Sequence, residues 1–170
     1  LIKLKKGNFH TTICIMIASI PAGFVGFFLK DRIESIFYDS NALFNLMIAY
    51  LLMSIVLYIS KFYHENRNSK ITYFYALLIG IAQSVAIIPG ISRSGLTIIV
   101  ALLLGITFKH ALKFSFMLAI PILFFAGGST LFENFNLLIS RNDLVIFLLL
   151  GMFSSIFSGY YIISILEKIV

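Results

Sequence analysis

Five long hydrophobic blocks divide this sequence, and they constrain its fold more than any other feature. The blocks are Thr11–Leu29, Ala42–Phe62, Tyr73–Ile106, Ala111–Phe132 and Leu144–Leu166. About 20 apolar residues span a bilayer as a helix, and the backbone of a span must find its hydrogen-bond partners internally. The chain is 60% hydrophobic and 12% charged, against roughly 25% charged residues in soluble domains. The pattern predicts an all-α integral membrane protein.

The third block is too long for a single span and is broken at its centre. As one helix it would measure roughly 50 Å, against about 30 Å for the hydrocarbon core of a bilayer. It also contains Pro89-Gly90, a pair that breaks helices. We therefore predict two short helices, about Tyr73 to Ile88 and Ser92 to Leu104, that form a re-entrant hairpin over about residues 73–105. The other four blocks are then transmembrane helices.

Basic residues lie at the ends of the apolar blocks and bear on topology. A hairpin that returns to the side it entered brings Lys109 and Lys113 to the side of Lys61 and Lys70. The basic excess then falls on one side of the membrane, as the positive-inside rule favours. The net charge of +6 is explained by topology and anionic headgroups of the bilayer, and no basic stripe with interleaved aromatics points to nucleic acid. Residues 1–170 are predicted to form a single transmembrane domain.

Two further patterns concern packing and the membrane interface. Small residues at four-residue spacing predict close helix approach in two blocks. They are Ala22 and Gly26 in the first block, and Gly151, Ser155 and Gly159 in the last. Residues 31–38 place apolar side chains at helical spacing among charges. They fit either a short amphipathic helix in the interface or a plain loop.

Arg93 stands out because it lies in the middle of a hydrophobic block. A charged side chain at the membrane centre costs at least about 2.5–3.5 kcal/mol, so it must be compensated. No acidic residue occurs between Glu65 and Glu133. The partner of Arg93 must therefore come from elsewhere in the protein or from a ligand.

The neighbours of Arg93 favour an anionic ligand. They are Gln83, Gly90, Ser92, Ser94, Gly95 and Thr97. The glycines allow a tight turn and a close backbone approach, and the hydroxyls are hydrogen-bond donors. A helix that begins near Ser92 points its free N–H groups into the same turn, and arginine binds phosphate oxygens in bidentate fashion. The structural alternative is an arginine that snorkels to the interface as an anchor, which is expected at the edge of a block and not at its centre.

Other residues that could carry chemistry are sparse. His10, His64 and His110 lie at block ends or in loops, and none has a second ligand at metal-binding spacing. Cys14 is the only cysteine, which excludes a disulfide or a thiolate metal site within the chain. There is no paired-carboxylate site and no P-loop. The sequence therefore offers one candidate site, without metal ligands.

At this turn the sequence resembles the undecaprenyl-diphosphatase family, bacterial membrane enzymes also known for bacitracin resistance. The family signature Pro-Gly-x-Ser-Arg-Ser-Gly-x-Thr corresponds to residues 89–97, with Gln83 as the upstream glutamine. Residues 113–121, Lys-Phe-Ser-Phe-Met-Leu-Ala-Ile-Pro, are similar to another family stretch. Ile20-Pro21-Ala22 and the loop that begins Lys30-Asp31 are similar to its middle region. The resemblance covers nearly the whole chain.

The resemblance implies a fold of two inverted repeats, each with a re-entrant hairpin, of which this chain holds the second. It implies a multi-pass hydrolase of the bacterial inner (plasma) membrane. The substrate would be a polyprenyl diphosphate, the carrier lipid of peptidoglycan synthesis, which is converted to the monophosphate and inorganic phosphate. Arg93 and Ser92 would be catalytic. The substrate-binding residues would be Ser94, Thr97, Gln83, Gly90 and Gly95. Whether the protein forms a homodimer stays open.

One departure from the family pattern matters. The family's first signature has paired glutamates followed by a serine-rich turn that ends in Gly-His, and no such segment occurs here. The resemblance implies a divalent cation, Mg²⁺ or Ca²⁺, whose ligands would lie in that segment and not in this chain. Since the chain begins at Leu1, we expect part of a longer protein without its N-terminal motif, inactive alone. The alternative function is a transporter or flippase for an anionic lipid, because transporters also bind anions at broken helices.

Overall fold

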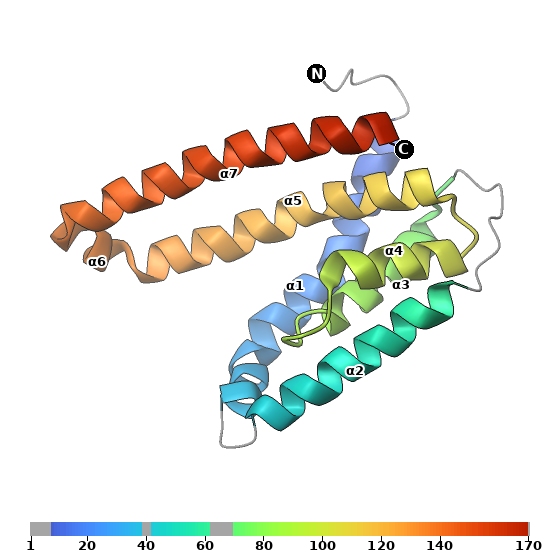
Figure 1. Ribbon diagram of the computed structural model, residues 1–170, viewed down its shortest axis with the longest axis horizontal. Helices are drawn as coiled ribbons and strands as arrows, with labels where there is room; N and C mark the ends of the chain where they lie inside the picture. Colours follow the sequence, from blue (N-terminus) through green and yellow to red (C-terminus); the bar gives the residue numbers. More distant parts are fainter. Residues whose placement is uncertain (1–7, 39–41, 62–69, 170) are drawn as a thin grey trace. The chain divides into compact units, whose positions relative to one another are not determined.

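The computed structural model describes residues 8–38, 42–61 and 70–169, which are almost entirely helical (Figure 1). The helices are α1 (Asn8–Tyr38), α2 (Ala42–Ser60), α3 (Tyr73–Val85), α4 (Arg93–Leu103), α5 (Phe108–Glu133), α6 (Phe135–Ser140) and α7 (Asn142–Ile169). Among the described residues, four segments are long and apolar enough to cross a membrane, one in each of α1, α2, α5 and α7. They are Phe9–Leu29, Ala42–Ser60, Phe108–Glu133 and Asp143–Ile165. The prediction of an all-α integral membrane protein is confirmed.

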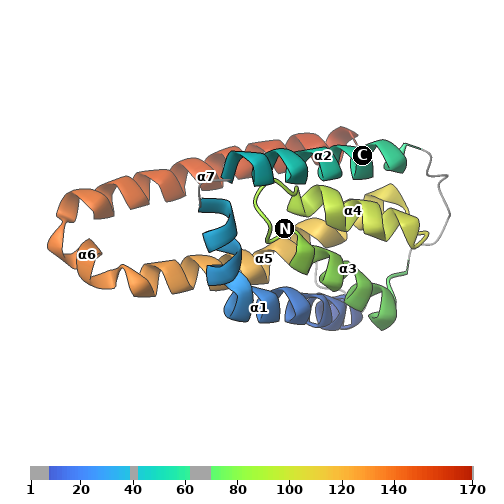
Figure 2. The same ribbon diagram turned by 90° about the horizontal axis from the view of Figure 1, so that it is seen from below.

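The third hydrophobic block forms two short helices, α3 and α4, which pack against each other (Figure 2). α3 has 13 residues and α4 has 11. At about 1.5 Å per residue neither reaches across a hydrocarbon core of about 30 Å. The two helices and their turn therefore suit a re-entrant hairpin. α3 ends three residues earlier than the predicted limit at Ile88, because the chain leaves helical geometry before the proline.

A glycine motif ends α4 and starts the turn into α5. Gly105 adopts a positive φ of 84° and donates its N–H to the Leu102 carbonyl at 2.8 Å. The N–H of Ile106 reaches back to the Ala101 carbonyl at 3.1 Å. These two bonds form a Schellman motif, which satisfies carbonyls that the helix end would leave free. The side chain of Ile106 is fully buried, so the sharp end of α4 is also locked by packing.

The contacts within the chain define two compact units, Leu1–Ile122 and Leu123–Val170. The first unit contains α1–α4 and the start of α5, and it holds the buried core. The second contains the end of α5 with α6 and α7, and α6 packs against α7. In this second unit a Cβ built at Gly151 or Gly159 has no neighbouring atom within 4 Å, so the close approach predicted there is not made inside the unit.

Small residues carry the contact between α1 and α3. Cys14 and Ala18 on α1, and Ala76 on α3, are fully buried at four-residue spacing, and Gly80 completes the α3 pair. A Cβ added at Gly80 would overlap the carbonyl oxygen of Ala18 and lie 2.7 Å from its Cα. Small residues at this spacing let helix backbones approach closely. At this crossing the backbones of α1 and α3 are in van der Waals contact at Ala18 and Gly80.

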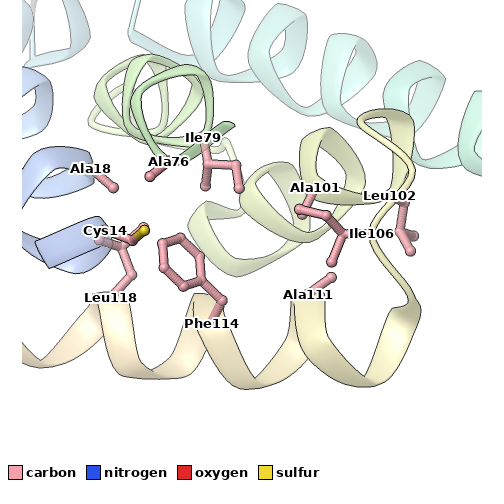
Figure 3. Close-up of a cluster of buried hydrophobic side chains, with 10 residues drawn as sticks. All are labelled: Cys14, Ala18, Ala76, Ile79, Ala101, Leu102, Ile106, Ala111, Phe114 and Leu118. Carbon is pink, nitrogen blue, oxygen red and sulfur yellow. The ribbon is translucent and has the colours of Figure 1, made fainter. Parts of the chain in front are cut away.

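One face of α5 closes the core of the first unit. Ala111, Phe114 and Leu118 are at most 2% exposed and lie at helical spacing on this face. Figure 3 shows the ring of Phe114 pointing from α5 toward Cys14 and Ala76. The first part of α5 therefore packs against α1 and against α3, the first helix of the hairpin.

Residues 31–38 continue α1 to Tyr38 as helix. The loop alternative is wrong, and the segment is the end of a 31-residue helix and not a separate short one. Its position in the membrane interface stays a prediction. Ala22 in the same helix is 5% exposed, and a Cβ at Gly26 would lie 3.8 Å from Ile87 Cδ1. The small residues predicted to pack in the first block therefore do face neighbouring parts of the unit.

Candidate functional site

The turn between α3 and α4 gives the site its backbone frame. α3 ends in short bonds of the i→i+3 type, such as Ile88 N–H to the Val85 carbonyl at 3.2 Å. A reverse turn follows, closed by the N–H of Ile91 on the Ile88 carbonyl at 3.2 Å. Pro89 in its second position and Gly90 in its third, with a φ of 93°, match a type II turn. Only glycine adopts this φ without strain, so the role of Gly90 is conformational.

Both glycines of the turn also face α2. A Cβ at Gly90 would lie 3.1 Å from the Cβ of Ala49, and one at Gly95 would lie 2.8 Å from Met53 Cε. Ala49 and Met53 are themselves buried, at 4% and 5% exposure. α2 therefore supports the turn from one side, and a side chain at Gly95 would also crowd Ser92, whose Oγ would be 2.9 Å away.

Ser92 caps the N-terminus of α4. Its Oγ accepts the N–H of Gly95 at 3.2 Å, and its backbone is extended, with φ −68° and ψ 110°. The first N–H groups of a helix have no partner within it, and Ser92 satisfies one of them. The N–H groups of Arg93 and Ser94 open the helix, at its positive dipole end. The side chains of Ser92 and Ser94 are exposed, so both can reach a ligand.

The guanidinium of Arg93 is held from two sides. Its Nε and Nη2 donate to Oε1 of Gln83 at 3.0 and 2.8 Å, and Nη2 also donates to the Leu118 carbonyl at 3.0 Å. An arginine can only donate, so the glutamine atom that takes both bonds must be the oxygen. The orientation of the Gln83 amide is therefore fixed by chemistry. The arginine head faces α3 and α5, unlike the interfacial anchor considered as an alternative.

The charge of Arg93 has no acidic counterpart in the described part of the chain. Its acceptors, an amide oxygen and a backbone carbonyl, are both neutral. Nη1 has no hydrogen-bond partner among these residues, so the N–H groups of one guanidinium end remain available. The positive charge is held in place but not neutralised, which is the condition for binding an anion.

Gln83 adds a second unsatisfied donor. The residue is 2% exposed, and its Nε2 is buried without a hydrogen-bond partner in the structure. A buried donor left unpaired costs about 1–3 kcal/mol, so such groups usually have a partner. Its Oε1 already binds Arg93, so the same amide carries the free N–H groups. An acceptor outside the described residues would satisfy both Gln83 and Arg93.

Thr97 lies on the buried side of α4 and not in the open turn. It is 2% exposed, and its hydroxyl donates to the carbonyls of Arg93 at 3.0 Å and Ser94 at 3.1 Å. The same oxygen lies 2.7 Å from Oγ of Ser115 on α5. A hydroxyl has a single proton, so Thr97 accepts from Ser115. The structure brings Gln83 and Arg93 together directly, whereas Thr97 reaches Arg93 only through its carbonyl.

Two groups at the site were missed by reasoning from the sequence. They are the Ser115 hydroxyl and the Leu118 carbonyl, both on α5. A backbone carbonyl has no sequence signature. Ser115 had a weak one, since it is the single polar residue within the apolar stretch of residues 114–121.

The donor set fits an anion and does not fit a divalent cation. The hairpin presents a guanidinium, an amide N–H, two serine hydroxyls and the N–H end of a helix, and none of the acidic ligands that hard cations require. Over residues 8–38, 42–61 and 70–169, no three His, Cys, Asp or Glu side chains gather as metal ligands. Together these groups can bind and stabilise phosphate oxygens, through fixed charge and backbone dipoles.

Comparison with known proteins agrees with this chemistry. A family model described as bacitracin resistance protein BacA matches residues 2–170. An undecaprenyl-diphosphatase from Sulfurihydrogenibium sp. is 37% identical over 163 residues, which cover 91% of this chain and 63% of the relative. A second, from Thermosipho melanesiensis, is 42% identical over 131 residues, or 75% of this chain and 50% of the relative. The chain thus spans between half and two thirds of these curated relatives. Because the family model matches almost all of its residues, the chain belongs to the bacitracin resistance protein BacA family.

Proposed function

We propose that the protein is a polyprenyl diphosphate phosphatase of the bacterial inner membrane, which hydrolyses undecaprenyl diphosphate to the monophosphate and phosphate. The hairpin supplies its diphosphate-binding half. The observation that carries the proposal is the guanidinium of Arg93, fixed by neutral acceptors beside the open N-terminus of α4. The names of the relatives, undecaprenyl-diphosphatase, support the choice of the lipid.

The geometry suits charge stabilisation in the hydrolysis of a diphosphate. Negative charge on the phosphoryl oxygens is met by Nη1 of Arg93 and by the first N–H groups of α4, which are in place before the reaction. The exposed hydroxyls of Ser92 and Ser94 are further donors, with Ser92 nearest the helix end. Nucleophile, base and cation ligands are expected from the family's first signature, which this sequence does not contain.

The decisive experiment compares hydrolysis with transport. The full-length protein, purified and placed in vesicles, is given a polyprenyl diphosphate, and both released phosphate and lipid translocation are measured. The proposal expects phosphate release that follows enzyme concentration. Translocation of an intact anionic lipid without phosphate release would instead support the transporter or flippase alternative.

The 170-residue chain alone is expected to release no phosphate from a polyprenyl diphosphate. The reason is that nothing beside Arg93 among the described residues activates a nucleophile or water. The measurement uses this chain, purified and folded, with a relative that carries both family signatures as the active control. Phosphate release by the chain at a rate comparable with that control would contradict the expectation.

Gln83→Glu is expected to raise KM for the diphosphate by at least about tenfold, or about 1.4 kcal/mol. A glutamate keeps the acceptor for Arg93, but it neutralises the guanidinium and lacks the free N–H of the amide. Ser84→Ala is the matched control on the same helix, because the Ser84 hydroxyl bonds only to the Ile81 carbonyl. An unchanged KM in Gln83→Glu would remove Gln83 from the binding site.

A further inference from the structure

α5 is linked to Arg93 by two routes, one direct and one through Thr97. The Leu118 carbonyl accepts Nη2 of its guanidinium at 3.0 Å. The Ser115 hydroxyl donates to Thr97 at 2.7 Å, and Thr97 donates to the Arg93 carbonyl at 3.0 Å. One helix is therefore linked to both the main chain and the guanidinium of the same residue. Ser115 and Thr97 are 18 residues apart in the sequence, and Leu118 and Arg93 are 25 residues apart.

Ser115 is out of place on its helix face unless it has a dedicated partner. It shares the face with Ala111, Phe114 and Leu118, all fully or almost fully buried and apolar, and it is itself 6% exposed. Serines in helices commonly satisfy themselves on their own backbone. Ser19, Ser84 and Ser129 do so here, with bonds of 2.6–2.9 Å to carbonyls three or four residues earlier. Ser115 bonds across to α4 instead.

The acceptor for the guanidinium lies in an unusual turn of α5. Pro121 has no N–H, so the helical hydrogen bond to the Met117 carbonyl is missing in this turn. The next carbonyl along the chain is that of Leu118, which receives Arg93. The side chain of Leu118 is fully buried, so this acceptor is held in place by the core.

We propose that the segment of α5 from Ser115 to Leu118 is a positioning element that sets the direction of the Arg93 guanidinium. Ser115 fixes the first turn of α4 through Thr97, and the Leu118 carbonyl fixes the head. Gln83 on α3 accepts two further hydrogen bonds from the same guanidinium. The inference rests on the proposed function only in taking a diphosphate as the ligand of Arg93. It gives residues 113–121 a role at the site, although they are far from Arg93 in the sequence.

A double-mutant cycle tests the Ser115–Thr97 link in the full-length protein. Ser115→Ala and Thr97→Val each remove one hydroxyl of the pair, and valine keeps the shape of threonine. Each is expected to lower kcat for diphosphate hydrolysis about tenfold, with a smaller change in KM, because a misdirected guanidinium loses contacts in the transition state. The double variant should be no worse than either single one, since both remove the same bond. Ser115→Thr, which keeps the hydroxyl, should restore kcat.

A second measurement does not depend on catalysis. Phenylglyoxal modifies arginine side chains, and mass spectrometry gives the rate at each site. We expect Arg93 to react several-fold faster in Ser115→Ala and in Thr97→Val than in the unaltered protein, because its head is released. Arg141, which is exposed on the other unit, is the internal control and should react equally in all of them. Ser129→Ala on α5 is the matched control variant and should leave Arg93 unchanged, because Ser129 bonds only to its own helix.

Failure of the inference and failure of the proposed function give different results. If the unaltered protein releases no phosphate, the phosphatase proposal is wrong, and the arginine reactivity still decides whether α5 positions Arg93. If Arg93 reacts at the same rate in both single variants, α5 does not position it. Multiplicative losses of kcat in the double variant, about a hundredfold together, would equally overturn the inference. Thr97→Val approaches the bond from α4, so it tests the link if Ser115→Ala does not fold.

Discussion

Arg93→Ala is expected to lower phosphate release from a polyprenyl diphosphate by about 10²–10³-fold, the usual loss for one preorganised electrostatic donor. The guanidinium is the only group at the hairpin with a full positive charge, and its acceptors leave that charge uncompensated. The variant should still insert into the membrane, because removal of a buried charge lowers the cost of insertion. The measurement is phosphate release per membrane-inserted protein.

Arg93→Lys separates charge from geometry in the same assay. A lysine keeps the charge but cannot hold Gln83 and the Leu118 carbonyl while it also presents a planar pair of N–H groups. Its activity should lie between the unaltered protein and Arg93→Ala. Arg141→Ala is the control for loss of a positive charge, since Arg141 is exposed and outside the hairpin. Activity of Arg93→Ala within a few-fold of the unaltered protein would show that the hairpin does not bind the diphosphate.

The membrane spans could be predicted from the sequence, because hydrocarbon imposes length and helicity on any apolar block. The hairpin was also predictable, since Pro89-Gly90 interrupts a block too long for one span. The residues at which its helices begin and end were less predictable. The predicted end of α3 at Ile88 was wrong, because the last turn becomes i→i+3 bonded before the proline, and single-sequence patterns do not distinguish such a turn from helix.

The contacts that complete the site could not be predicted. Gln83 and Arg93 were both expected at the turn, but only the structure reveals that the amide oxygen faces the guanidinium and leaves Nε2 unpaired. The α5 contacts depend on how two helices pack, and Leu118 contributes through its backbone. The hydroxyl of Thr97 and the family resemblance predict a substrate-binding residue, but they do not indicate that its side chain is buried and bonds to Ser115 on α5.

The same limit holds for the small residues. The four-residue spacing in the last block resembles a packing face, yet Gly151 and Gly159 have open space within their unit. The close crossing is between α1 and α3, where Ala18 of α1 lies against Gly80 of α3. Spacing on one helix indicates that close approach is allowed, and the partner helix decides whether it occurs.

Gly80→Ala is expected to destabilise the first unit by about 1–3 kcal/mol, the usual range for an extra methyl group in a full core, or more. The new Cβ would overlap the Ala18 carbonyl and lie 2.7 Å from its Cα. Both are backbone atoms, so no side chain can rotate away and α1 must separate from α3. That movement also loosens the end of α3 that carries Gln83 to Arg93. The measurement is thermal unfolding in detergent together with the yield of folded protein.

Gly23→Ala is the matched control, because Gly23 lies on α1 with no neighbouring atom within 4 Å of a Cβ built there. Alanine also favours helix over glycine by about 1 kcal/mol, so this variant should be neutral or slightly stabilising. The same propensity gain is present in Gly80→Ala, so the difference between the two variants isolates the cost of the overlap with Ala18. Equal unfolding temperatures for the two variants would mean that α1 and α3 do not cross as closely as Ala18 and Gly80 require.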